Sequence, residues 1–397
     1  MRIAVVDDLF PPGEEAARMP TALARRYAAE GHDVLVLGAA RRGARGEDGR
    51  DGFRVVRLPA IAARRTGPSG GFDLSLRALL PGNKRRVARL LGEFRPDVLH
   101  LHGQFSDLSW LAGRYAREHR VPTLFSINAF NVRDKKFCAM LLRLLDAFVV
   151  KRILARLDAR FVAGDKQGLA HCARRYGIAD QDVECFPIAV DAGRYDLPPT
   201  RNIRAEQAIG DGPLIVSMGH VVPSRNRLPL VEAMPAILDR HPRTRVLVVG
   251  AVYDDSFVER AEELGVRHAL SVRGAVPKED IPAYFAAADI VAQDLNGGCG
   301  TASLAAMLSA TPTIVSVGED NFPGIVLRDG VNMLLVPPDN AEAVAATVLD
   351  LLADPARAAW IARRQSETAR RHFTLGVVAD RHLLALEKLV AGNAFRP

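Results

Sequence analysis

The chain has 397 residues, of which 48% are hydrophobic and 25% charged, a composition typical of a globular protein with room for two domains. No apolar run approaches the roughly 20 residues that a membrane-spanning helix needs. The net charge of +7 fits an anionic membrane surface or an arginine-rich surface without a special role, whereas nucleic-acid binding is disfavoured, because only 6% of the residues are aromatic and none interleaves with the basic runs.

In the first half of the chain, short apolar runs alternate with helical patterns. They predict strands at 3–7, 33–37, 98–101, 122–127, 159–162 and 183–186, helices at 16–30, 106–118 and 166–176, and a long helical pattern at 134–160. Strands that are apolar throughout and separated by helices indicate a parallel sheet with both faces covered.

The alternation stops at residues 191–212, which are polar and hold two prolines and three glycines, so we place a linker at 196–212. It resumes with strands at 214–217, 245–249, 269–272, 290–292, 313–315 and 333–336, and with helices at 227–240, 257–264, 279–286 and 341–352 before a final pair of helices. The pattern predicts an α/β protein with two doubly wound, Rossmann-like domains, 1–195 and 213–374. We expect them to face each other across a ligand-binding cleft, with the last helix, 375–397, crossing back to the first domain.

Two stretches, 83–95 and 134–160, mix basic and apolar positions. Such helices can lie on anionic lipid headgroups, or their apolar faces can pack on a sheet. The N-terminal sequence MRIAVVDDLF becomes acidic within eight residues, unlike a secretory signal, and the four cysteines form no C-x-x-C pair that would indicate a zinc site or a disulfide framework. We expect a cytoplasmic protein, and peripheral contact with the inner face of the membrane stays open.

The stretch DIVAQDLNGGCGTASLAAMLSATPTIVS, residues 289–316, carries the strongest functional signal. An apolar strand meets a glycine-rich bend, and a helix of small residues opens at Thr301. A helix start aims free backbone N–H groups and its dipole at one point, an arrangement that suits a phosphate. We predict that the N–H groups from Gly300 to Ser303 bind a phosphate, assisted by the hydroxyls of Thr301 and Ser303; a plain strand–helix connection is the alternative.

Several motifs, in their order and spacing, resemble the GT-B glycosyltransferases of family 4, which are retaining enzymes that use nucleotide sugars. The similar stretches are GHDVLVL, RPDVLHLHG, VPTLFSINAF, LIVSMGHVVPSRNRLPLVEAMPAI, VPKEDIPAYFAAADIV and LRDGVNMLLVPPDNAEAVAATVLDLLADP. The resemblance covers nearly the whole chain. It implies a GT-B fold and transfer of a sugar from a nucleoside diphosphate donor to a small-molecule or lipid-linked acceptor, in carbohydrate or natural-product biosynthesis. It also implies retention of the anomeric configuration, with no cofactor and no obligatory metal.

The donor-site residues that the resemblance implies differ from the family pattern. The two family glutamates, one beside the sugar hydroxyls and one on the ribose, fall on Gly297 and Ala305. The arginine and lysine that neutralise the diphosphate fall on His220 and Arg225, of which Arg225 can clamp two phosphate oxygens. The residues expected to bind the donor are His220, Arg225, Arg227, Gly298, Cys299, Gly300, Thr301, Ala302, Ser303 and Gly274, the last for backbone contact with the base.

The first domain supplies the catalytic candidates. The family histidine near the transferred sugar matches Asn128, which can hydrogen-bond a hydroxyl but cannot shuttle protons at neutral pH. Glu14 and Glu15 replace a Gly-Gly pair and can bind an acceptor or activate a nucleophile, or can simply favour the start of the next helix. His102 ends a strand that we expect to face the cleft, although packing explains it equally well. The catalytic candidates are therefore Asn128, His102, Glu14 and Glu15.

The missing glutamates leave several interpretations open. Each charged hydrogen bond to a sugar hydroxyl is worth roughly 1.5–3 kcal/mol, so the loss of both is costly. The donor is unusual, or nearby groups such as Asp294, Asn296, Glu319 and Asp320 replace the acids. Alternatively, the protein is a catalytically degenerate GT-B protein that acts as a binding or auxiliary subunit. Transfer to nitrogen or sulfur, or epimerisation of a nucleotide sugar, is a further possibility. The base, the sugar, the acceptor and the oligomeric state have no readable signature.

Overall fold

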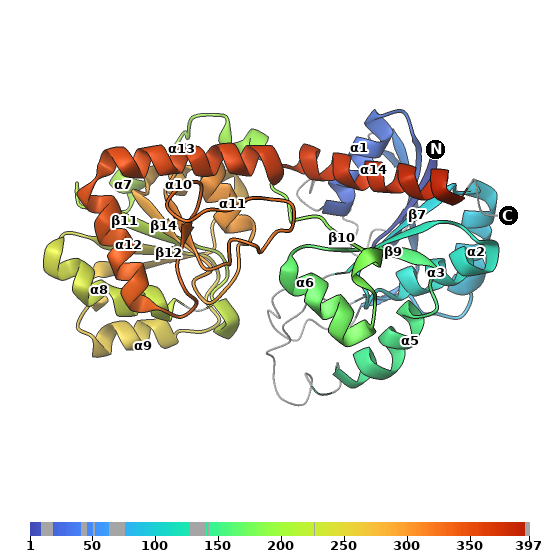
Figure 1. Ribbon diagram of the computed structural model, residues 1–397, viewed down its shortest axis with the longest axis horizontal. Helices are drawn as coiled ribbons and strands as arrows, with labels where there is room; N and C mark the ends of the chain where they lie inside the picture. Colours follow the sequence, from blue (N-terminus) through green and yellow to red (C-terminus); the bar gives the residue numbers. More distant parts are fainter. Residues whose placement is uncertain are drawn as a thin grey trace. The chain divides into compact units, whose positions relative to one another are not determined.

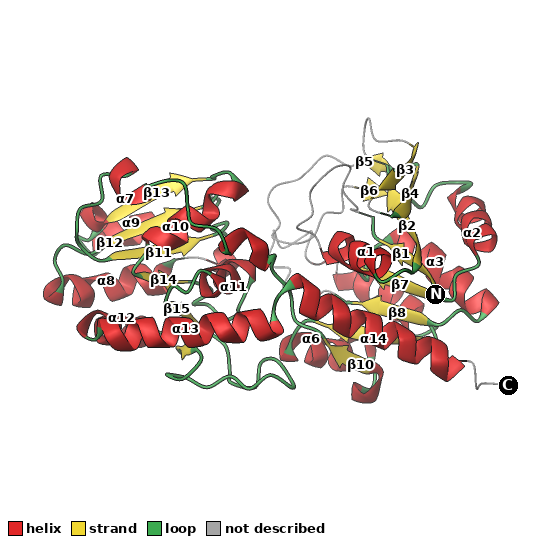
Figure 2. Ribbon diagram, turned by 90° about the horizontal axis from the view of Figure 1, so that it is seen from above, coloured by secondary structure: helices red, strands yellow, loops and turns green. Residues whose placement is uncertain are grey.

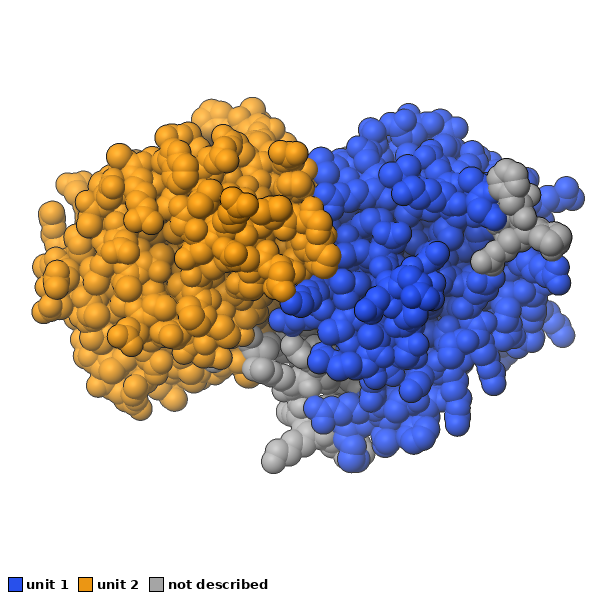
Figure 3. Space-filling model, in the orientation of Figure 1, with its two compact units in different colours: residues 1–187, 375–397 blue, residues 188–374 orange. Residues whose placement is uncertain are grey.

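The computed structural model of the protein describes residues 1–8, 19–40, 46–50, 52–62, 76–127, 140, 143–225 and 227–393. The chain forms two compact units (Figure 3): unit 1 comprises Met1–Pro187 and Leu375–Pro397, and unit 2 comprises Ile188–Thr374. None of the helices that the structure describes combines the length and the apolar character needed to cross a bilayer.

Unit 1 is built on an eight-stranded sheet with the order β10-β9-β8-β7-β1-β2-β4-β3. Its strands are β1 (Arg2–Val6), β2 (Asp33–Ala39), β3 (Gly46–Arg50), β4 (Phe53–Leu58), β7 (Val98–His102), β8 (Thr123–Ser126), β9 (Ala159–Ala163) and β10 (Val183–Cys185). All neighbours pair in parallel except β3 and β4, which pair antiparallel at the edge. A separate antiparallel pair consists of β5 (Ile61–Ala62) and β6 (Leu76–Arg77).

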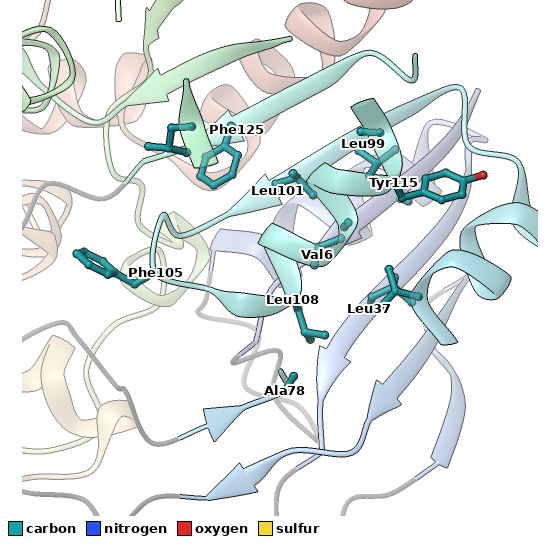
Figure 4. Packing of buried hydrophobic residues seen from close by; sticks show 14 of the residues in the cluster. Val6, Leu37, Ala78, Leu99, Leu101, Phe105, Leu108, Tyr115 and Phe125 are labelled. Carbon is teal, nitrogen blue, oxygen red and sulfur yellow. The ribbon is translucent and has the colours of Figure 1, made fainter. Parts of the chain in front are cut away.

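Helices cover both faces of this sheet. They are α1 (Met19–Ala29), α2 (Asn83–Phe94), α3 (Asp107–His119), α5 (Lys151–Leu154), α6 (Lys166–His171) and α14 (Leu375–Asn393). Successive residues of a strand point to opposite faces. Ile3 and Val5 of β1 therefore pack towards α1 and α14, whereas Val6 packs with Leu108 of α3 in a second cluster (Figure 4). The C-terminal helix α14 lies beside α1 within unit 1 (Figure 1).

The helical pattern predicted at 134–160 extends too far. In the part that the structure describes, a π-helical turn at Asp146–Val150 leads into α5, which ends at Leu154, and the chain is extended from Ala159 as β9. The pairing of β9 with β8 and β10 requires an extended backbone, and this tertiary pairing overrides the helical pattern at its end.

Unit 2 contains a six-stranded, fully parallel sheet with the order β13-β12-β11-β14-β15-β16 (Figure 2). Its strands are β11 (Leu214–Met218), β12 (Arg245–Val249), β13 (Leu270–Gly274), β14 (Ile290–Ala292), β15 (Thr313–Val315) and β16 (Leu334–Leu335). Its helices are α7 (Ile203–Glu206), α8 (Leu228–Arg240), α9 (Ser256–Glu263), α10 (Ile281–Ala287), α11 (Thr301–Leu308), α12 (Ala341–Ala353) and α13 (Pro355–His372). The prediction of two doubly wound α/β domains is confirmed.

The two faces of the unit 2 sheet have separate apolar layers. Ile215 and Val246 pack with α8, α9 and α12, and Val216 and Leu247 pack with α7, α10 and α11. Residues 196–212, for which the sequence predicts a linker, lie in unit 2 and contain α7. The guanidinium of Arg204 donates to the carbonyls of Ala287, Gly210 and Gly212, so this segment is tied to the end of α10 and to the chain that leads into β11.

Two glycines bring the ends of β11 and β12 together. The N–H of Gly219, after β11, donates to the carbonyl oxygen of Val249 at 2.8 Å. A Cβ at Gly250 would lie 2.2 Å from the carbonyl oxygen of Gly219, and the φ of Gly250 is +141°, a value that other residues rarely adopt. Only glycine fits at position 250, and this contact sets the start of the loop that leads from Gly219 into α8.

The substitution Gly250→Ala is expected to destabilise unit 2 by about 2 kcal/mol or more, because the methyl group collides with backbone atoms and the backbone is strained. The free energy of unfolding, measured by urea denaturation, checks this. Gly92→Ala in α2, where a Cβ meets nothing within 4 Å, is the matched control and should be neutral or slightly stabilising. Equal stability of the two variants would contradict the account of this contact.

Candidate functional site

The glycine-rich bend of unit 2 connects β14 to α11. Gly297 and Gly298 adopt φ values of +105° and +133°, and the N–H of Gly298 donates to the carbonyl oxygen of Ser316 at 2.7 Å. This bond ties the bend to the chain that leaves β15. The bend therefore delivers Gly300 and Thr301 to the amino end of α11 at the carboxyl edge of the sheet.

A carboxylate of the chain itself occupies part of this helix end. One oxygen of Asp294 accepts hydrogen bonds from the N–H of Gly300 and from the hydroxyl of Ser303, both at 2.7 Å. Asp294 is only 8% exposed, and its φ of +52° turns the chain so that the side chain can reach back. The amino end of a helix favours negative charge, so Asp294 stabilises the bend and α11.

Two further backbone donors at this helix end belong to residues that reach the surface. The first N–H groups of a helix have no acceptor within the helix, which leaves those of Thr301 and Ala302 for an outside partner, whereas Ser303 is fully buried. Thr301 is exposed and Ala302 partly exposed. The Ser303 hydroxyl, by contrast, is fully buried and already donates to Asp294, so only Thr301 presents an exposed hydroxyl.

The loop after β11 carries three cationic or titratable side chains. Arg227 is 3% exposed, and its guanidinium donates to the carbonyl oxygens of Arg225 at 2.7 Å and Gly219 at 3.2 Å. Its Nε has no partner in the part of the chain that the structure describes. Burial lowers the pKa of Arg227 to about 10 against the opposing attraction of Asp294, so Arg227 is a buried cation near neutral pH.

Arg225 and His220 lie at the surface of the same loop. Both side chains are exposed, and the His220 ring lies 5.8 Å from that of Tyr253. Because β11 and β14 are hydrogen-bonded neighbours, this loop and the amino end of α11 leave from adjacent strands. The strand order also reverses at this pair, the position at which doubly wound sheets bind ligands.

The other predicted donor residues have clear positions. Gly274 ends β13 with φ +77°, and its carbonyl oxygen accepts the N–H of Gly250 at 2.8 Å. Cys299 is buried, and burial raises the pKa of its thiol well above the ordinary value. Gly297 is exposed with open space around it, while Ala305 is buried in the apolar layer beneath α11.

Three of the nearby polar residues that the sequence offers as replacements for the missing acids are engaged within the protein. Asp294 binds the start of α11, and the side-chain amide of Asn296 donates to the carboxylate of Asp339. The carboxylate of Glu319 accepts the N–H of Asp329 at 2.9 Å. A replacement of the family glutamates by any of these side chains would require it to leave its present partner.

In unit 1, three of the four catalytic candidates, Asn128, Glu14 and Glu15, lie outside the described residues. His102 is described, and it is buried together with His100 of β7 and His382 of α14. The ring of His100 lies 4.1 Å from that of His102 and 5.1 Å from that of His382. His100 also contacts the Tyr27 and Ser126 hydroxyls at 3.1 Å. Burial lowers the pKa of His102 and of His382 to about 3, so these rings are neutral.

An acidic pair at the carboxyl edge of unit 1 was not among the candidates. Burial, followed by the nearby Asp107 carboxylate, raises the pKa of Asp8 well above its ordinary value, while hydrogen bonds from Ser106 and Leu108 oppose the rise. Asp107 accepts the N–H groups of Ala78 and Leu79 at 2.9 and 3.0 Å. Asp8 follows β1 and Asp107 begins α3 after β7, and these strands are neighbours at the reversal of the strand order. The only sequence signal is an acid just after a buried strand.

Comparison with known proteins agrees with this architecture. Residues 16–189 match the model of the glycosyl transferase 4-like domain, and residues 199–372 match that of glycosyl transferases group 1. Over 98% of its length the chain superposes on HepE of Anabaena, crystallised with UDP, with a TM-score of 0.72 at 17% identity and coverage of all of that chain. The two models together cover most of both units, and the chain belongs to the GT-B glycosyltransferases of family 4.

Two characterised relatives are similar over part of the chain. The GDP-mannose-dependent alpha-(1-6)-phosphatidylinositol monomannoside mannosyltransferase of Mycolicibacterium smegmatis is 31% identical over 205 residues, which are 49% of this chain and 52% of that protein. A D-inositol 3-phosphate glycosyltransferase of Segniliparus rotundus is 26% identical over 253 residues, 62% of this chain and 56% of that protein. The chain thus spans about half the length of the curated relatives it matches.

The buried histidines of unit 1 predict a loss of stability in acid. Above the ordinary histidine pKa of about 6.5 the rings are neutral in both states, and the stability is fully present. As the pH falls from about 6.5 towards 3, these histidines bind protons in the unfolded chain but stay neutral in the folded chain, and this difference favours unfolding. Each of His102 and His382 then contributes a loss of about 1.4 kcal/mol per pH unit.

Urea denaturation of the wild type and of His382→Leu over this pH range measures the effect. The variant should show a shallower dependence of the unfolding free energy on pH. His220→Gln removes an exposed histidine and should leave the wild-type dependence intact. A slope that is the same in all three proteins would show that the buried cluster does not control acid stability.

Proposed function

We propose that this protein transfers a sugar from a nucleoside diphosphate sugar to an acceptor, with the donor bound by unit 2. The observation that carries the proposal is the convergence of the free N–H groups at the start of α11 with the Arg225 and Arg227 loop, at the strand-order reversal of the sheet. Backbone N–H groups and arginines are the groups that bind a diphosphate. The names of the relatives, which act with GDP-mannose or on inositol phosphate, support the same reaction class.

The proposed chemistry is departure of the diphosphate with electrostatic support. Negative charge develops on the leaving oxygen as the glycosidic bond breaks, and each well-placed donor typically contributes about 3 kcal/mol to such a transition state. Thr301 and Ala302 would supply backbone donors, and Arg225 would supply an exposed charge. Retention at the anomeric carbon and independence from metal belong to the proposal, and turnover that persists in EDTA is the expected result.

For the acceptor, we propose a hydroxyl-bearing compound, either a small molecule or a lipid-linked one. One relative is named for transfer to a phosphatidylinositol mannoside, which supports a lipid acceptor and peripheral contact with an anionic membrane. Within unit 1, the buried Asp107 and the partly exposed Asp8 lie at the carboxyl edge of the sheet. Desolvation of the Asp8 carboxyl raises its pKa and so favours the protonated form, and a protonated carboxyl can donate a hydrogen bond to an acceptor oxygen.

A second candidate is a catalytically degenerate protein that binds a ligand or assists a partner. One observation favours it: Ala305, at the position of the second family glutamate, is packed in the apolar layer of unit 2, with no room left for a solvated acid. The two candidates differ in product formation. A screen of UDP-, GDP- and ADP-sugars with lipid extracts and sugar phosphates, read by product mass, tests them. Glycosylated product supports the enzyme, whereas binding of a nucleoside diphosphate without product supports the degenerate form.

Arg225→Ala is expected to weaken binding of the nucleoside diphosphate by at least tenfold, since a charge-assisted hydrogen bond is worth roughly 1.5–3 kcal/mol. Isothermal calorimetry with UDP and GDP measures this. Arg240→Ala, which removes an exposed cation at the opposite end of α8, is the control and should bind as the wild type does. Unchanged affinity of Arg225→Ala would remove this residue from the donor site.

Asp294→Asn is expected to bind the nucleoside diphosphate more tightly, by roughly tenfold. The amide oxygen can still accept from Gly300 and Ser303, but the negative charge that repels a phosphate at the same helix end is gone. Ser303→Ala, which weakens the same bonds and keeps the charge, is the control in the calorimetric titration and should show no gain. Weaker binding by Asp294→Asn would mean that the charge of Asp294 assists the ligand.

A further inference from the structure

One face of the helical stretch from residue 143 to Leu154 packs against the core of unit 1. Asp146, Val150 and Leu154 follow one another at four-residue steps and are all buried. Val150 and Leu154 belong to the apolar cluster that includes α3, and the carboxylate of Asp146 accepts from the guanidinium of Arg175 and the hydroxyl of Tyr176. These contacts hold the stretch against unit 1 and pair the carboxylate of Asp146, which is the one acid in residues 143–157.

The opposite face is apolar and exposed. Met140, Leu144 and Phe148 also follow one another at four-residue steps, and they are 52%, 46% and 57% exposed. Val149 beside them is 37% exposed. Large apolar side chains scattered singly on a surface need no explanation, but four within ten residues on one side of a helix form a patch that marks an interaction site.

Cations border this patch. The next four-residue steps after Phe148 are Arg152 and Arg156, and Lys151 lies next to Arg152; all three are exposed, as is Arg143 at the other end. Asp146, the one acid in residues 143–157, faces inward and is paired. A helix with an exposed apolar stripe and a cationic border is complementary to an anionic bilayer, because the apolar side chains enter the headgroup region while the cations stay at the phosphate level.

We propose that the outer face of residues 143–156 binds an anionic lipid bilayer through Leu144, Phe148 and Val149, with Arg143, Lys151, Arg152 and Arg156 on the acidic headgroups. Figure 1 shows α5 at the periphery of unit 1, with no other labelled element beyond it on that side. This surface would provide the membrane contact of the proposed function, but its binding to lipid does not depend on sugar transfer. The two proposals therefore fail independently.

A second basic helix provides a matched comparison. The outer face of α2 also presents exposed cations, among them Lys84 and Arg85, but none of the large exposed apolar side chains lies on it. If lipid binding resulted only from the net charge of the protein, loss of cations from α2 and from the 143–156 face would weaken it equally.

Sedimentation of the full-length protein with vesicles tests the proposal. The vesicles contain phosphatidylcholine alone or phosphatidylcholine mixed with phosphatidylglycerol, at low and at high salt. We expect binding to the mixed vesicles that is at least roughly tenfold stronger than to neutral ones and that weakens with salt. Leu144→Ser combined with Phe148→Ser, and Arg152→Glu combined with Arg156→Glu, should each reduce it by roughly tenfold or more. Lys84→Glu combined with Arg85→Glu should reduce it far less.

A reporter variant reads the same contact directly. Phe148→Trp places a fluorophore at an exposed position, and its emission should shift to the blue and be quenched by brominated lipid when anionic vesicles are added. Unchanged emission, absence of binding to any vesicle, or equal losses for the α2 pair and the 143–156 pairs would each overturn the proposal. Circular dichroism and binding of UDP or GDP, measured for each variant, separate failure of this surface from failure of the donor site or of folding.

Discussion

The carboxylate of Asp294 at the amino end of α11 is the interaction on which the proposed donor site depends. It accepts the N–H of Gly300 and the hydroxyl of Ser303, and so holds the glycine bend against the helix. The Asp294 carboxylate is thus an anion of the protein itself at the position where the helix dipole attracts anions. The consequence is twofold: the protein itself fixes the geometry of the helix end, and a diphosphate bound there as proposed would lie beside a negative charge, on the N–H groups that remain.

The buried cation Arg227 is the counterpart of this carboxylate. Its guanidinium donates to the carbonyl oxygens of Gly219 and Arg225, so it shapes the loop and leaves the Arg225 side chain as the exposed charge. Burial of an ion is costly unless other groups compensate, and Asp294 supplies part of that compensation. The close approach of Gly250 to Gly219 fixes the same loop from the other side. The proposed donor binding therefore relies on backbone groups and on the two buried charges of Asp294 and Arg227. These take the place of the two glutamates that the family resemblance implies.

The architecture was readable from the sequence because its strands are apolar runs of the length that a covered parallel sheet requires. Strands β3 and β4 were missed, since GEDGR is polar throughout and FRVVRL carries two arginines. At the site, the small-residue helix and its glycine bend were recognised in the sequence, but the hydrogen bonds of Asp294 were not. They depend on a backbone φ of +52° at Asp294, a value that its residue type does not indicate. For His102 the sequence left packing and a role in the cleft open; its burial could not be decided there, because the neighbouring His382 comes from α14 at the far end of the chain.

The most direct test of the central claim is the response of single backbone amides to the ligand. In a nuclear magnetic resonance titration of the isotope-labelled protein with UDP or GDP, the N–H signals of Thr301 and Ala302 should shift and saturate together with the binding isotherm. Signals of α13, in the same unit, should stay in place. Saturable binding that leaves Thr301 and Ala302 unperturbed, or no response to any nucleoside diphosphate, would contradict the assignment of the α11 amino end as the diphosphate site.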